Sequence, residues 1–207
     1  MIRFFCIVVL FLTTTVTAQV VGCTDPHSTN YNSNATVNDG SCVYSNMSVA
    51  PLTSNVLPEI LNETSGLIFW DNVLLTHNDD TDTKIYGLQQ EGWQVSAEYA
   101  VPNQINTDWE EISQDEDFIY IGDFGNNAAG NRGDLRILKI AKAGFEQQQN
   151  VQIISFAYQD QADLGSVNSN ATDFDCEAFI VSSDYIYLFT KQWTSMETTV
   201  YRLPKVE

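Results

Sequence analysis

Basic side chains are scarce in this sequence. Nine lysines and arginines stand against 27 aspartates and glutamates among 207 residues, which gives a formal charge of −18. Phosphate backbones and anionic membrane surfaces need a cationic face, so the charge excludes nucleic acid as a partner and disfavours such membranes. Because 43% of the residues are hydrophobic, the chain is also too apolar for a disordered acidic tail. We expect a folded, soluble protein that attracts cations.

Long apolar runs are absent beyond the start of the chain. The run at residues 4–12 follows Arg3 and precedes a small-residue stretch at 16–18. Its length is about half of the roughly 20 residues that a membrane helix needs, and this order of segments is typical of a cleaved export signal. We assign residues 1–18 to a signal peptide. The protein is therefore expected to be secreted or at the cell surface, with no membrane insertion after cleavage.

Cysteine is also rare, and only four are present. Cys6 leaves with the signal, while Cys23 and Cys42 bracket a polar segment that has too few aliphatic residues to form a core. Export permits oxidation, so we predict a Cys23–Cys42 disulfide that stabilises the segment by about 3 kcal/mol. The remaining Cys176 lies between two acids, which raise a thiol pKa and indicate a small core residue rather than a nucleophile.

The segment between the paired cysteines is rich in Asn and Asp. Asn30, Asn32 and Asn34 alternate ahead of a turn at residues 38–40, as oxygen ligands do in calcium loops. The carboxylates and terminal Glu of an EF-hand are missing, so we favour the alternative that these side chains cap their own turns. The order C-T-D-P-x-x-x-N-Y-N-x-x-A-T-x-x-D-G-S-C resembles a short module of secreted bacterial surface proteins. The resemblance implies an extracellular spacer or adhesion-type module.

A repeat organises the rest of the chain, which consists of short β-rich runs and has no long segment with helical periodicity. Each of three units opens with an acid that is followed four positions later by a large apolar residue; the openings are Glu63, Asp108 and Asp175. A second run follows at 73–77, 118–122 and 185–190, a third at 84–88, 135–140 and 199–203, and a fourth at 93–101 and 151–158. Units of this length are typical of four-stranded propeller blades. A β-sandwich is the alternative, but it would not require an acid at the head of every unit.

The openings read E-x-S-G-L, D-x-E-x-I and D-x-E-A-F, with Ile-Gly-Asp and Asn-Asn after the second. Their order resembles the esterase-like phytase and SdiA-regulated group of β-propellers over residues 57–203. The resemblance implies about six blades, calcium near the propeller axis and, in some members, phosphoester hydrolysis. We therefore predict an all-β protein. Its parts are a disulfide-stapled module at 19–45, a linker at 46–56, and at 57–207 a partial β-propeller of about three blades, with further blades in a longer protein.

Propeller geometry explains why the acids matter. The loops that enter the first strand and leave the second strand of each blade open on one face around the central channel. The entering loops carry the metal candidates Glu63, Asp108, Glu110, Asp175 and Glu177, and the leaving loops carry the ligand-facing candidates His77, Asn78, Asp79, Asp123 and Asn126. Crowded carboxylates repel one another, and a calcium ion offsets that repulsion. The alternative is that the acids cap strand ends and face water.

A complete catalytic set is not evident in the sequence. No G-x-S-x-G elbow occurs, and the candidates for catalysis are His77, which lies beside acids, and Lys191. Two functions stay open: a secreted calcium-binding β-propeller that acts as a binding or adhesion module for an unknown extracellular ligand, and a calcium-dependent phosphoesterase whose full site needs further blades. The second needs cations over the channel, where Lys191, Arg132 and Arg136 could contribute.

Overall fold

The computed structural model describes residues 18–80, 82–147 and 150–205. The chain divides into two compact units, Met1–Ser54 and Asn55–Glu207. Apart from Ala18, the predicted signal peptide lies outside the described residues. None of the helices in the described ranges is long and apolar enough to span a membrane.

The smaller unit is held by its disulfide. Cys23 and Cys42 are bonded, with their Cα atoms 4.8 Å apart, so the predicted pairing is confirmed. The Asn and Asp side chains of this unit cap turns. Asn32, Asn38 and Asp39 each accept a hydrogen bond from the backbone N–H two residues further on. These bonds replace the hydrophobic core that the segment is too polar to form.

Within its described residues, the larger unit contains three antiparallel sheets and two short 3-10 helices, η1 (Glu59–Leu61) and η2 (Phe145–Gln147). The first sheet has the order β1 (Thr64–Trp70), β2 (Val73–Asn78), β3 (Lys84–Leu88) and β4 (Val95–Ala100). The second has β5 (Trp109–Gln114), β6 (Phe118–Asp123), β7 (Arg136–Ala141) and β8 (Val151–Ser155). The third has β9 (Asp175–Val181), β10 (Tyr185–Lys191) and β11 (Val200–Pro204). The all-β prediction is confirmed, and each repeat unit forms one sheet.

Each sheet is a meander in which sequential strands pair with one another. The tight β1–β2 hairpin shows why. Trp70 pairs with Val73, and the two turn residues, Asp71 and Asn72, have φ angles of 48° and 62°. A two-residue hairpin with positive φ at both turn positions matches the twist of its strands, and Asp and Asn tolerate that region better than other side chains.

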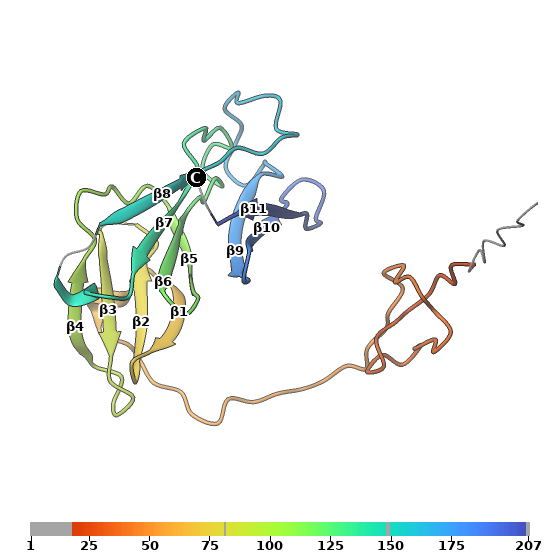
Figure 1. Cartoon of the computed structure of the whole chain (residues 1–207), viewed down its shortest axis with the longest axis horizontal. Coiled ribbons are helices and arrows are strands. Elements are labelled where there is room, and N and C mark those ends of the chain that lie inside the picture. The colour runs from red at the N-terminus through yellow and green to blue at the C-terminus, as the bar shows by residue number, and fades with distance from the viewer. Residues whose placement is uncertain (1–17, 81, 148–149, 206–207) are drawn as a thin grey trace, which may run out of the picture. The chain divides into compact units, whose positions relative to one another are not determined.

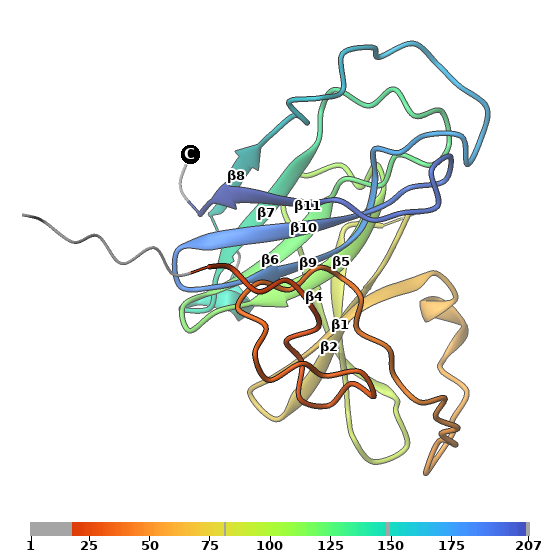
Figure 2. The same ribbon diagram turned by 90° about the vertical axis from the view of Figure 1, so that its right-hand side faces the viewer.

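The second sheet lies between the other two, and the first strands β1, β5 and β9 are neighbours (Figures 1 and 2). Alternation along β6 supplies both contacts, because Ile119 and Ile121 pack against the first sheet while Tyr120 packs against the third. Cys176 is buried in the second of these cores, and burial raises its pKa to about 12, as expected for a core residue. No strand pairing joins one sheet to another among the described residues, and the sheets do not close a ring.

Close approach of β1 and β5 depends on a glycine. A Cβ atom on Gly66 would meet the backbone nitrogen of Ile112, and the side chain of Ser65 donates a hydrogen bond to the carbonyl oxygen of Glu110. The first strands of neighbouring sheets therefore touch through their backbones at the point where their opening motifs begin.

Candidate metal centre

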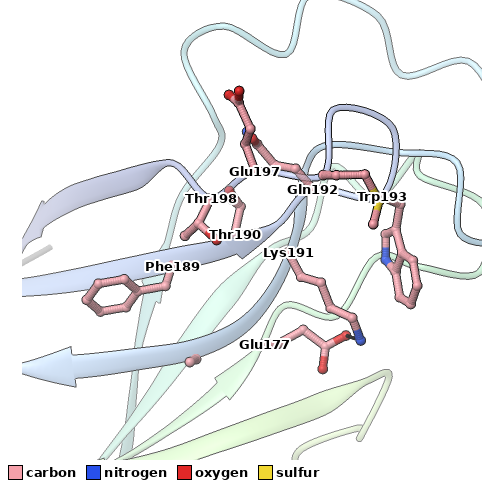
Figure 3. A pocket seen from close by; sticks show the side chains of 10 residues that line it. Glu177, Phe189, Thr190, Lys191, Gln192, Trp193, Glu197 and Thr198 are labelled. Atoms are coloured by element: carbon pink, nitrogen blue, oxygen red, sulfur yellow. Dashed lines mark hydrogen bonds and ion pairs between the residues drawn. The ribbon is translucent and has the colours of Figure 1, made fainter. Parts of the chain in front are cut away.

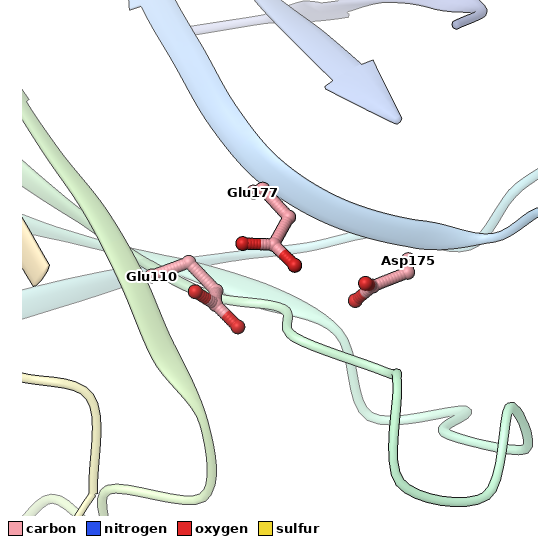
Figure 4. Close-up of side chains that lie close together, drawn as sticks. All are labelled: Glu110, Asp175 and Glu177. Atoms are coloured by element: carbon pink, nitrogen blue, oxygen red, sulfur yellow. The ribbon is translucent and has the colours of Figure 1, made fainter. Parts of the chain in front are cut away.

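Three carboxylates converge where β5 and β9 begin. Glu110 is the second residue of β5, and Asp175 and Glu177 are the first and third residues of β9. Each can offer one oxygen such that the three oxygens lie within 4.8 Å of one another, and Figure 4 shows the side chains pointing toward a common point. We call these three residues the acidic triad. Glu110 and Asp175 are buried, and Glu177 is partly buried.

Strand periodicity and strand irregularity together place the triad. The period of two puts Asp175 and Glu177 on one face of β9, while Cys176 between them points into the core. The pairing register shifts between Trp109 and Ile112 in β5 and at Glu177 in β9. Such β-bulges redirect side chains and are common beside functional sites. No local sequence pattern predicts these bulges.

Two hydrogen bonds orient the carboxylate of Asp175. Its Oδ1 accepts from the backbone N–H of Asn126, and its Oδ2 accepts from the indole Nε1–H of Trp193, each at 2.8 Å. Burial raises the pKa of Asp175 to about 6, although these two bonds act in the opposite direction. Trp193 was missed in the sequence; its only signal is an aromatic residue shortly after the end of the third unit's second run.

The carboxyl group of Glu110 has a strongly raised pKa. Burial, reinforced by the negative charges of Glu177, Asp108 and Asp175, raises the pKa of Glu110 to about 9. At neutral pH and without a cation, its carboxyl group therefore keeps its proton. A dication among these oxygens would reverse that preference.

Glu177 has a partner cation. The Nζ of Lys191 lies 2.8 Å from Glu177 Oε1 and 4.2 Å from the centre of the Trp193 ring. Both charged side chains are partly exposed, with 47% and 30% of the Lys191 and Glu177 side chains accessible. Lys191, the last residue of β10, therefore lies beside the triad and pairs with one of its three acids.

Of the other predicted metal residues, Asp108 lies near Glu110, and Glu63 lies outside the triad. Burial raises the pKa of Asp108 to about 6, and the nearby Arg132 acts against that shift. A Cβ on Gly125 would meet the carboxylates of both Asp108 and Glu110, so these two acids flank the loop that follows β6. Glu63 is exposed and outside the triad; its charge acts on Asp79 instead, whose pKa is raised mainly by burial.

The ligand-facing candidates are mostly occupied by interactions within the fold. Asp123 is fully buried and forms ion pairs of 2.9 Å with Arg132 and 2.8 Å with Arg136. The side chain of Asn126 donates to the carbonyl of Phe174, and its oxygen accepts from the backbone N–H of Arg132. These residues fix the loop that carries the hydrogen bond to Asp175.

The end of β2 is similarly enclosed. His77 is fully buried, its ring stands edge-on to Trp109 at 5.7 Å, and its Nδ1 lies 3.0 Å from the carbonyl oxygen of Asn78. Burial lowers the pKa of His77 to about 4, so the imidazole is neutral at physiological pH. The side chain of Asn78 donates to Ile60 and Asp82. Asp79 is partly exposed, and its Oδ1 is buried without a hydrogen-bond partner.

The donor set and its spacing fit calcium. Calcium binds oxygen at 2.3–2.6 Å, so two oxygens on one ion can stand at most about 5 Å apart. The triad oxygens lie within 4.8 Å of one another, which is inside this limit.

Comparison with known proteins supplies no family for this chain. No protein-family model matches it, and no curated protein matches it. The geometry of the site is therefore the basis for assigning a function.

Proposed function

We propose that this protein is a secreted calcium-binding β-propeller that acts as an extracellular binding module. One observation carries the proposal: three carboxylates from the first strands of two neighbouring sheets converge within 4.8 Å. Secretion rests on the signal-like sequence at residues 1–18 and agrees with the disulfide of the small unit.

The arrangement of the sheets supports the propeller. Propeller blades are four-stranded meanders that pack face to face around a channel. Here the sheets pack in sequence order, through two hydrophobic cores, with their first strands adjacent. Acid-led openings then fall at the same position of each sheet, which explains how residues 65 positions apart in the chain, Glu110 and Asp175, reach one site.

The negative charge of the acidic triad supports the proposal that it binds a cation. Among the residues that the structure describes, Lys191 alone is in ion-pair contact with the three carboxylates of the triad. Burial and, after it, the neighbouring carboxylates raise the pKa of Glu110, so a negative charge at this position is unfavourable without a cation. A hard dication with oxygen ligands stabilises that charge, and an acidic protein attracts such ions.

Isothermal titration of the protein with calcium tests the proposal. Glu177→Gln should weaken calcium affinity at least about tenfold, since it removes a charged ligand. The matched control is Glu98→Gln, because Glu98 also pairs with a lysine, Lys84, at 2.7 Å and is similarly accessible, but it lies on β4. Equal affinities for the two variants would contradict the proposal, as would the absence of calcium binding in the parent protein.

The phosphoesterase alternative has less support. The three cations predicted to contact phosphate are each paired with a carboxylate: Lys191 with Glu177, and Arg132 and Arg136 with Asp123. A polyphosphate substrate needs cations that are free to bind it. Phosphate release from a panel of phosphoesters in the presence of calcium measures this activity directly, and turnover that depends on Lys191 would favour the alternative.

A further inference from the structure

A pocket beside the acidic triad belongs to the third sheet alone. It has a volume of about 410 Å³ and lies against β9, β10 and the loop between β10 and β11 (Figure 3). Its lining combines the aromatic residues Phe189 and Trp193, the charged residues Glu177, Lys191 and Glu197, and the hydroxyl of Thr198. This volume is within the usual range for small-molecule sites.

The loop that walls the pocket is held in place by hydrogen bonds. Asp173 Oδ1 accepts from the backbone N–H groups of Thr194 and Ser195, at 2.8 and 3.0 Å. The indole of Trp193 is fixed by its bond to Asp175 and lies against the ammonium group of Lys191. Because the aromatic wall is already ordered, ligand binding would cost little conformational entropy.

Two polar side chains at the pocket are free. Glu197 and Thr198 are exposed, and neither side chain makes a hydrogen bond within the described parts of the chain. By contrast, the side-chain amide of Gln192 is engaged with Thr199 and Ser195. The free groups are a carboxylate and a hydroxyl, on the same loop as Trp193.

We propose that this pocket binds a neutral saccharide of one or two sugar units. A sugar presents an apolar C–H face, which packs on aromatic rings, and a rim of hydroxyls, which bond to carboxylates, hydroxyls and ammonium groups. Two glutamates against one lysine give the lining a net negative charge, which disfavours an anionic ligand. The charged groups disfavour a purely apolar ligand, because it would leave them desolvated.

The inference rests on the proposed role as an extracellular binding module and names its ligand class. It does not require the ion, since Glu177 is the only triad residue that lines the pocket. The two proposals can therefore fail separately. Saccharide binding should persist in the presence of a chelator, and calcium binding should persist in variants of Glu197.

NMR titration of the ¹⁵N-labelled protein with glucose, galactose, N-acetylglucosamine and maltose tests it. The reporter is the indole N–H signal of Trp193, which Trp193→Phe assigns. At least one sugar should shift this signal saturably. Glu197→Ala and Thr198→Val should each weaken that sugar's binding about tenfold, while Glu91→Ala, at an exposed glutamate between β3 and β4, should leave it unchanged.

Three results would overturn the inference. The first is that no sugar shifts the Trp193 signal saturably. The second is that the shift survives in both Glu197→Ala and Thr198→Val, which would place the sugar elsewhere. The third is that sodium acetate shifts the signal saturably at lower concentration than any of the four sugars, which would make the pocket an anion site.

Discussion

The raised pKa of Glu110 predicts that stability without metal falls as pH rises. In the unfolded chain this carboxyl group has an ordinary pKa of 4.5, and in the folded protein the pKa is about 9. Between these values the folded state holds a proton that the unfolded state has released. The free energy of unfolding should therefore decrease with increasing pH in this window, by up to about 1.4 kcal/mol per pH unit.

Calcium binding should remove this pH dependence of the free energy of unfolding. The calcium affinity should itself depend on pH. An ion that binds the triad replaces the proton on Glu110, so binding releases about one proton at neutral pH. Calcium affinity should then rise by up to about tenfold per pH unit below pH 9. Urea unfolding at a series of pH values, with calcium and with a chelator, measures the first effect. Titration calorimetry in two buffers of different ionisation enthalpy counts the protons.

Glu110→Gln separates charge from packing in this prediction. The amide is nearly isosteric and cannot ionise, so the metal-free variant should be more stable than the parent protein at pH 8. It should lack the pH slope between about pH 6 and pH 9, above the raised pKa values of Asp108 and Asp175. It should also lose calcium binding. A slope that persists in Glu110→Gln above pH 6, or a variant that is less stable than the parent at pH 8 without metal, would refute the reasoning.

Three further predictions concern the framework of the site. Arg136→Met should destabilise by about 2 kcal/mol in urea unfolding, because the fully buried Asp123 would keep Arg132 but lose its second arginine partner; Lys84→Met, which breaks an exposed pair, should destabilise much less. Gly66→Ala should lower the melting temperature by several degrees, because its Cβ meets the β5 backbone; an unchanged melting temperature would contradict that packing. Cys42→Ser should destabilise the small unit by about 3 kcal/mol and leave the melting of the sheets unchanged; calorimetry with two separate transitions would resolve this.

Strand positions could be predicted closely because hydrophobic runs and turn residues are local signals. The runs at 73–77, 84–88 and 118–122 correspond to β2, β3 and β6 within one residue at each end. The fourth runs were predicted too long; 151–158 ends as β8 at Ser155. The residues beyond it are apolar for another reason, since Phe156 and Tyr158 pack against the third sheet. Periodicity cannot distinguish strand residues from loop residues that fill a core.

The site could be predicted in part. Its position follows from the order of the strands, but which acids take part in it depends on the residue found at each position of the opening motif. Glu110, Asp175 and Glu177 follow from the repeat, whereas Glu63 occupies the corresponding opening in the first unit and stays outside the triad. Ser65 stands where Glu110 stands in the second unit, so the first sheet contributes no equivalent carboxylate. Asp123 is engaged in ion pairs with arginines 9 and 13 positions further along the chain, and no local sequence pattern predicts these pairs.

The central claim is that the acidic triad binds calcium, and a crystal structure of the protein grown with calcium tests it most directly. The account predicts one ion that contacts oxygens of Glu110, Asp175 and Glu177 at 2.3–2.6 Å, with anomalous signal at that position. Water or the ammonium group of Lys191 among the three carboxylates, with no ion there at saturating calcium, would contradict it.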